Sequence, residues 1–426
     1  MAQPTLYQQV LDYANRANPY PLYAQLRQTP VRREPDGTYV ISTYREIMAL
    51  LHDPRVSSDE RNRLRPGGAT ATPAYGTATG AGAAPPGPAM GEHPSFLGLD
   101  PPAHDVLRQQ AMRQFGPPHT PDRIDGLRSA IEQLANSLID SFQGKTQVDV
   151  VDEFSYPLPV TVICRLLGVP REDEPRFHDW ADVLVQSLDP SPPANPAEGQ
   201  RRAAAEAQTV LEMGLYMTQL IQAHRQQPGD DMLSGFATDE GAEGRMSDRE
   251  IASTGILLLI AGHETTVNLI TNGMLTLLRH PDALARLRRE PELIIRTVEE
   301  LLRFEPPVQL MPTRTTLADI SLAGTTIPKG SPLILANAAG NRDPARFADP
   351  DRFIPDREDN QHLGFGSGIH SCFGAPLARL EAQIALSALV RRLDNPRLVV
   401  DPPPYRPNPV LRGPRHLQVA LDGITA

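Results

Sequence analysis

The chain has 426 residues, of which 40% are hydrophobic and 22% are charged, and its formal net charge is −10. Such a chain can bury a large core. Its acidity argues against nucleic acid as a partner, because phosphate binding needs a basic face. Only Cys164 and Cys372 could form a disulfide, so we expect a reduced, cytoplasmic protein. We see no signal peptide and no apolar run of about 20 residues that would anchor the chain in a membrane.

Helical patterns dominate the chain between clusters of proline. They cover residues 19–28, 44–53, 103–114, 121–143, 159–167, 172–188, 200–226, 247–279, 281–288, 291–303 and 375–393. Strand-like runs are short and lie at 38–42, 320–322, 331–335 and 418–421. The sequence therefore predicts one mainly α-helical domain, residues 1–426, with small peripheral β-sheets.

Segment 66–90 differs from the rest of the chain because it is uncharged and of low complexity. It cannot bury enough apolar area to offset the entropy of ordering, so we expect a mobile surface loop. The loop is either a lid over a binding pocket or an inert insertion, since lengthening a loop costs only about 0.6 kcal/mol per doubling.

One cysteine lies in a run rich in glycine and phenylalanine, Phe365-Gly-Ser-Gly-Ile-His-Ser-Cys-Phe-Gly374, and a helical pattern follows directly. Pro376 is compatible with a first helical turn. Cys372 is thus predicted just before a helix N-terminus, where free N–H groups stabilise a thiolate. The alternative is a buried cysteine in a glycine-rich turn.

This arrangement, Phe-x-x-Gly-x-His-x-Cys-x-Gly, resembles the haem-binding loop of the cytochrome P450 family, and the resemblance extends from about residue 18 to the end of the chain. It implies a triangular helical body that holds haem b between a distal, oxygen-activating helix and the helix after the cysteine loop. Cys372 would be the axial thiolate ligand of the iron. The haem contacts implied by the resemblance are His104, Arg108, Ala261, Gly262, Arg314, Phe365, Gly366, His370 and Cys372.

The run Ala261-Gly-His-Glu-Thr-Thr266 interrupts a long apolar helix. A metalloprotease motif is excluded, because a second histidine would be needed where Val267 stands. From the residues alone, a polar kink in a core helix is an equal alternative. In the family's distal helix this pattern would assign Glu264 and Thr265 to proton delivery toward dioxygen, while the two small residues leave room for oxygen and substrate.

Two further pairs of residues share helical faces. Glu300 and Arg303 are three apart, and in the family such a pair forms a structural triad with the arginine of a Pro-x-Arg-Phe element, here Arg352. His104 and Arg108 are four apart and, with Arg314, would bind the haem propionates, which favour charged partners. Without the resemblance, both pairs would be solvated surface pairs contributing roughly 0–1 kcal/mol.

The resemblance implies a haem-thiolate monooxygenase that inserts one oxygen atom of O2 into an apolar organic substrate. The pocket candidates are apolar and suggest a lipid, a terpenoid or a polyketide-like molecule: Leu258, Ala261, Val308, Leu310, Met311 and Leu411. Electrons would come from a ferredoxin and its NAD(P)H-dependent reductase, with Arg113 and Arg379 beside the docking face, and the enzyme would be a monomer. The alternatives are a peroxide-driven peroxygenase, a haem-binding sensor without turnover and a helical interaction protein without a cofactor.

Overall fold

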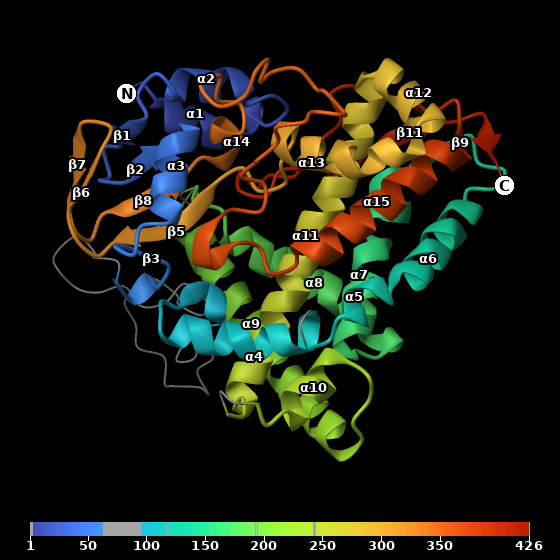
Figure 1. The fold of residues 1–426 in the computed structure, drawn as a ribbon, viewed down its shortest axis with the longest axis horizontal. Coiled ribbons are helices and arrows are strands. Elements are labelled where there is room, and N and C mark those ends of the chain that lie inside the picture. Colours follow the sequence, from blue (N-terminus) through green and yellow to red (C-terminus); the bar gives the residue numbers. More distant parts are fainter. Residues whose placement is uncertain are drawn as a thin grey trace.

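The computed structural model describes residues 3–62, 95–116, 119–191, 193, 195–241 and 244–425. The predicted loop at 66–90 lies outside the described residues. Figure 1 shows the larger sheet at one side of the molecule and the helices filling the rest, as the sequence predicts for a mainly α-helical body.

The helices are long in the middle of the chain and short near its N-terminus. They are α1 (Leu6–Leu11), α2 (Tyr20–Leu26), α3 (Tyr44–Leu51), α4 (Ala103–Phe115), α5 (Asp122–Asp125), α6 (Arg128–Asp140), α7 (Pro157–Leu167), α8 (Glu174–Ser187), α9 (Pro196–Gln226), α10 (Met232–Thr238), α11 (Asp248–Arg279), α12 (Pro281–Arg289), α13 (Ile294–Phe304), α14 (Asn337–Gly340) and α15 (Ala375–Arg392).

The strands form small sheets. A five-stranded sheet has the order β1 (Val31–Arg33), β2 (Tyr39–Ile41), β8 (Pro332–Leu335), β5 (Met311–Thr316) and β3 (Val56–Ser57), in which β2 and β8 are parallel. A three-stranded sheet joins β10 (Arg397–Leu398), β11 (Gln418–Ala420) and β4 (Gln147–Asp149). Two pairs complete the set: β12 (Gly423–Ile424) with β9 (Leu393–Asp394), and β6 (Ile320–Leu322) with β7 (Thr325–Ile327).

Helix α11 crosses the centre of the molecule (Figure 1) and is buried along most of its length. It begins at a capping box, in which the Ser247 hydroxyl accepts from the Glu250 N–H and the Glu250 carboxylate accepts from the Ser247 N–H. This satisfies two backbone donors that a helix start otherwise leaves unpaired. Helices α7, α8, α9, α13 and α15 pack around α11, so its apolar faces form the main core.

The predicted helices agree with the structure except at a few boundaries. The predicted helix 121–143 is divided into α5 and α6, because Gly126 and Leu127 interrupt the helix and glycine is a poor helix former. The predicted helix 291–303 opens as a 3₁₀ turn over Pro291–Leu293 before α13 begins. The sequence patterns missed α1, α10 and most of the short strands, because segments of two to seven residues carry little periodicity.

None of the described helices is both long and apolar enough to cross a bilayer.

Candidate active site

A cavity lies between α11 and the cysteine loop that precedes α15. The wall toward α11 presents Leu258, Ala261, Gly262 and Thr265, and the opposite wall presents Cys372. Gly262 is where α7 approaches α11 closely, because a Cβ atom there would lie 3.2 Å from Ile163. The cavity is therefore bounded by apolar or small side chains on one side and by a thiol on the other.

The cysteine loop is held by its own backbone. The N–H of Cys372 donates to the Phe365 carbonyl at 2.8 Å, and Gly366 and Gly368 have positive φ angles that suit glycine. Gly374 is the N-cap of α15, so Cys372 lies just before a helix N-terminus, as the sequence predicts.

The environment of the Cys372 thiol has opposing effects on its pKa. The side chain is accessible from the cavity, and protein surrounds it on the other sides. This desolvation raises the pKa of the thiol. The backbone N–H groups of Gly374 and Ala375 and the charges of Arg108 and Arg379 oppose the rise. The site is thus built to hold a thiolate once a cation lies in the cavity.

Two histidine rings meet beside the cavity; His370 lines it, and His104 packs behind His370. The ring centroids of His104 and His370 are 4.4 Å apart. Nδ1 of His104 bonds Asp105 at 2.8 Å, whereas its Nε2 and the Nδ1 of His370 are buried without a hydrogen-bond partner among the described residues. Burial, followed by the nearby Arg314 charge, lowers the pKa of His370 to about 3.

Two guanidinium groups, those of Arg108 and Arg314, lie close enough to His370 to affect its pKa, although Arg314 does not line the cavity. Arg108 lines the cavity and donates to the Ser371 carbonyl at 2.7 Å. Arg314 lies on β5 and is 7% exposed, and burial lowers its pKa to about 10. No carboxylate of the described residues forms an ion pair with either arginine. Unpartnered imidazole nitrogens and unpaired guanidinium groups fit the two carboxylates of a haem, and Cys372 fits its iron, so these residues are compatible with a bound haem.

The two polar residues of the α11 motif point in different directions. Thr265 lines the cavity, and its hydroxyl donates to the Ala261 carbonyl at 2.7 Å. Glu264 is 1% exposed, does not line the cavity and contacts Asn268 and Arg406 on the far side of the helix. The sequence places the two residues side by side, but the structure separates their side chains.

Four of the six predicted pocket residues line the cavity. Leu258, Ala261, Val308 and Met311 line the cavity, whereas Leu310 and Leu411 do not. The side chain of Leu310 packs into the hydrophobic core, where it is fully buried, and does not reach the cavity. Leu411 pairs across an isolated β-bridge with Val308, which does line the cavity. The prediction missed other apolar lining residues, which include Phe96, Leu97, Phe115, Ile163, Leu257, Leu269 and Leu302.

The structural triad contains a different arginine from the one predicted. Glu300 and Arg303 are fully buried and joined at 2.8 Å, and Nε of Arg357 lies 3.0 Å from the same carboxylate. The side chain of Arg352 is 74% exposed and pairs with Asp349, and only its carbonyl accepts from Arg303. The carbonyls of Pro350 and Arg352 accept from Arg303, and the Arg352 side chain points to solvent. Arg357 therefore replaces Arg352 as the third member.

The two arginines expected at the docking face are bound within the chain. Arg113 pairs with Asp239 at 2.8 Å, and Arg379 pairs with Glu299 at 2.7 Å. Glu299 also accepts from His362. Each arginine is thus largely neutralised by a carboxylate of its own chain, which argues against a dominant part for them in attracting an acidic partner.

The sequence interpretation missed a buried acid in the cavity wall. Glu381 of α15 is 2% exposed and lines the cavity, and its Oε2 has no hydrogen-bond partner in the part of the chain that the structure describes. Desolvation raises the pKa of this carboxyl well above its ordinary value. The spacing of Leu377, Ala378 and Glu381 on one helical face could have placed it beside the cavity.

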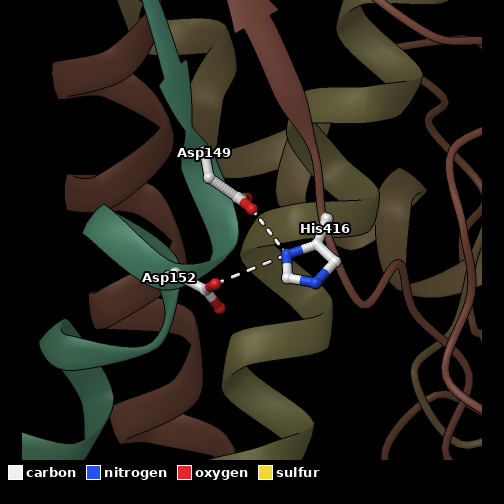
Figure 2. Close-up of side chains that lie close together, drawn as sticks. All are labelled: Asp149, Asp152 and His416. Carbon is white, nitrogen blue, oxygen red and sulfur yellow. Dashed lines mark hydrogen bonds and ion pairs between the residues drawn. The ribbon is translucent and has the colours of Figure 1, made fainter.

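A second cluster of polar side chains joins β4 to the segment before β11. Figure 2 shows His416 between Asp149 and Asp152, with its Nδ1 at 2.7 and 3.4 Å from their carboxylates. Asp149 also accepts from the N–H groups of Val151 and Leu417 and from the Gln418 amide. Since Arg415 pairs with Asp152 as well, the lone pairs a metal ion would need are occupied. We interpret the cluster as a structural link between the strands.

Comparisons with known proteins agree with the geometry of the cavity. The family model described as Cytochrome P450 matches residues 92–421. The chain belongs to the cytochrome P450 family.

The similarity extends over nearly the whole chain. The chain is 39% identical over 414 residues to the cytochrome P450 monooxygenase PikC of Streptomyces venezuelae, covering 95% of this chain and 91% of that protein. It is 37% identical over 413 residues to 6-deoxyerythronolide B hydroxylase of Saccharopolyspora erythraea, covering 95% and 96%. The solved structure of the cytochrome P450 PksS of the Bacillus subtilis 168 bacillaene polyketide synthase matches with a TM-score of 0.83 at 32% identity, covering 97% and 99%. The chain is therefore a haem-thiolate monooxygenase that uses O2, an organic substrate and a redox partner.

The corrected triad predicts which arginine stabilises the fold. Replacing Arg357 by Met removes a hydrogen-bonded cation from buried Glu300 and should lower the free energy of unfolding by about 1.5–3 kcal/mol. Arg352→Met is the matched control and should change it by no more than about 0.5 kcal/mol, because its side chain is exposed. Urea unfolding of the haem-loaded proteins measures both. Equal losses in the two variants, or a larger loss for Arg352→Met, would contradict the assignment.

The raised pKa of Glu381 predicts a pH-dependent effect on stability. The native state retains a proton that the unfolded chain releases above about pH 4.3, so wild-type stability falls as pH rises through this range. Glu381→Gln removes this loss. The difference in free energy of unfolding between Glu381→Gln and the wild type should therefore grow, in favour of the variant, by up to roughly 1.4 kcal/mol per pH unit above pH 5. Urea unfolding at several pH values measures this difference.

The exposed Glu358 supplies the control for this experiment. Glu358→Gln should give a pH profile parallel to that of the wild type, because its carboxyl is solvated in both states. A parallel profile for Glu381→Gln as well would show that Glu381 is ionised in the native protein.

Proposed function

We propose that this monooxygenase holds haem b through Cys372 and inserts one oxygen atom into an apolar molecule of the lipid, terpenoid or polyketide class. One observation carries the proposal. Cys372, just before α15, lines the same cavity as three residues of α11. These residues are Ala261, Gly262 and Thr265. When bound, the haem supplies the activation of dioxygen, and the thiolate donates electron density that favours O–O cleavage.

The protein's own residues would bind and orient the cofactor. Cys372 would ligate the iron, and Phe365 and Gly366 would lie against the ring, since both line the cavity beside the cysteine. His104, His370, Arg108 and Arg314 would hold the propionates. The support for this is the pair of unpartnered imidazole nitrogens and the two arginines without an ion-pairing carboxylate among the described residues.

Thr265 would hold a proton donor at the cavity, and Glu264 would replenish it from behind α11. The support for Thr265 is that its hydroxyl lies at the cavity wall, where the bond to the Ala261 carbonyl leaves its oxygen free to accept. The support for Glu264 is its buried carboxylate, which precedes Thr265 by one position in α11. General acids placed in this way contribute about 10²–10⁴-fold to a rate.

The cavity wall supports an apolar substrate. Its α11 side presents Leu257, Leu258 and Leu269, and Val308 and Met311 face them. Such lining favours molecules that gain free energy by leaving water, at about 25 cal/mol per Å² of apolar surface buried. One relative is a hydroxylase of 6-deoxyerythronolide B, which is consistent with a polyketide-like molecule.

Electrons would come from a ferredoxin-type protein with an NAD(P)H-dependent reductase, and the enzyme would act as a monomer. Ile369 of the cysteine loop is an exposed apolar side chain, 49% exposed. It supports a contact made by apolar packing, because Arg113 and Arg379 are paired internally.

The ligand assignment predicts the spectrum of the reduced carbon monoxide adduct. The wild type should show the far-red-shifted Soret band of thiolate ligation, and Cys372→His should lose this band even if it retains haem, because imidazole donates less electron density than thiolate. Cys164→Ala is the matched control, because Cys164 is buried in α7 and does not line the cavity. It should keep the band. A red-shifted band in Cys372→His would overturn the assignment.

A further inference from the structure

The ends of three helices meet at the ring of His224, which lies in the last turn of α9. Its Nε2 is 3.1 Å from the carbonyl of Gly168, the C-cap of α7. Its Nδ1 is 2.8 Å from the Ser234 hydroxyl and 3.2 Å from a carboxylate oxygen of Asp231, the N-cap of α10. These three side chains and the Gly168 carbonyl form the His224 cluster, which links α7, α9 and α10.

The cluster is compact and largely shielded from water. Only 14% of the His224 side chain and 10% of the Asp231 side chain are exposed. Gly168 has a φ of 79°, and a Cβ atom there would lie 2.5 Å from Cγ of Asp231 and 2.6 Å from Cε1 of His224. Glycine at this position therefore allows the end of α7 to lie directly against the ring and the carboxylate.

The hydrogen atoms of the cluster follow from the chemistry of its partners. A carbonyl can only accept, so Nε2 of His224 carries a proton. The Ser234 hydroxyl accepts from the Gly229 N–H at 2.8 Å and donates its single hydrogen to Oδ2 of Asp231 at 2.8 Å. Nδ1 of His224 then faces two oxygen atoms that can only accept from it, so it carries a proton as well.

A neutral ring would leave the cluster one hydrogen short. If the Ser234 hydroxyl donated to the ring instead, Oδ2 of Asp231 would lie 2.8 Å from the hydroxyl oxygen with no hydrogen between them. A buried carboxylate oxygen without a donor is costly. The extra proton belongs on the imidazole rather than on the carboxyl, because these two groups ordinarily titrate near pH 6.5 and pH 3.9 respectively.

The neighbouring charged residues on α9 and before α10 are paired elsewhere. Arg225, the next residue of α9, pairs with Asp248, and Asp230 pairs with Arg123. The contact from α7 is a backbone carbonyl. Within the described part of the chain, the ring therefore forms its one ion pair with Asp231.

We propose that His224 is an imidazolium that latches the ends of α7, α9 and α10 together and releases them as the pH rises. The unfolded chain loses an imidazole proton around pH 6.5, whereas the folded cluster needs this proton to satisfy its acceptors. The stability that the latch contributes is therefore complete below about pH 6.5 and declines at higher pH. Because α7 also carries Ile163, which lines the cavity, the latch fastens one end of a helix in the cavity wall.

The protonation state of the ring is tested directly by nuclear magnetic resonance of the haem-loaded protein with ¹⁵N-labelled histidine. In the diamagnetic, reduced carbon monoxide adduct, both ring nitrogens of His224 should resonate as N–H nitrogens at about pH 7, where most of a free imidazole is neutral. His224→Gln identifies the two signals by their loss. A ring with one unprotonated nitrogen at this pH would overturn the proposal.

Asp231→Asn supplies the missing hydrogen without removing the cluster. The new amide can donate to the Ser234 oxygen, whose hydroxyl can then donate to a neutral His224 ring, and asparagine remains a good N-cap for α10. Only the wild type then needs the extra proton. The ratio of the unfolding constants of wild type and variant should therefore rise with pH, by up to about tenfold per unit above pH 6.5. Urea unfolding of the haem-loaded proteins between about pH 6 and pH 8.5 measures this ratio.

His280→Gln is the matched control for a histidine that needs no extra proton. Nδ1 of His280 bonds the Thr276 carbonyl at 2.8 Å, and a neutral imidazole satisfies this bond. The ratio of its unfolding constant to that of Asp231→Asn should therefore stay constant over the same pH range. A ratio between wild type and Asp231→Asn that is equally constant would overturn the proposal.

Discussion

The buried Arg303 side chain connects the segments on which the cysteine loop depends. Its guanidinium pairs with Glu300 in α13 and donates to the carbonyls of Asn341, Pro350 and Arg352. Asn341 in turn accepts from the Leu363 N–H, directly before the loop. Loss of one partner from such a buried network costs several kcal/mol. The position of Cys372 against α11 therefore depends on a network that has no contact with the cavity.

Much of the site could be predicted from the sequence because its decisive part is local. The loop that presents Cys372 is closed by a hydrogen bond between residues only seven apart, Cys372 and Phe365. Its glycines and the following helix are visible in the sequence. The choice between Arg352 and Arg357 was not visible. Each follows a Pro-Asp pair, and which arginine turns inward depends on the hydrogen bonds that the Pro350 and Arg352 carbonyls accept from the distant Arg303.

The distal side shows the opposite case. A pattern of adjacent Glu264 and Thr265 predicts cooperation, yet the helical rotation of about 100° per residue sends the two side chains in different directions. The carboxylate of Glu264 contacts Arg406, which lies more than a hundred residues later in the sequence. A local sequence pattern cannot predict such a contact. Leu310 and Leu411 were placed at the pocket for a similar reason. Successive side chains of an extended segment point to opposite sides, and the Val308–Leu411 β-bridge joins segments far apart in the sequence, so the sequence alone does not tell which side chains reach the cavity.

The central claim is that Cys372 binds the haem iron through sulfur. Iron K-edge X-ray absorption of the haem-loaded wild-type protein tests it most directly, because the fine structure reports the atoms bound to the metal. We expect a shell of porphyrin nitrogens and one sulfur neighbour. A first shell that contains only nitrogen or oxygen would contradict the account.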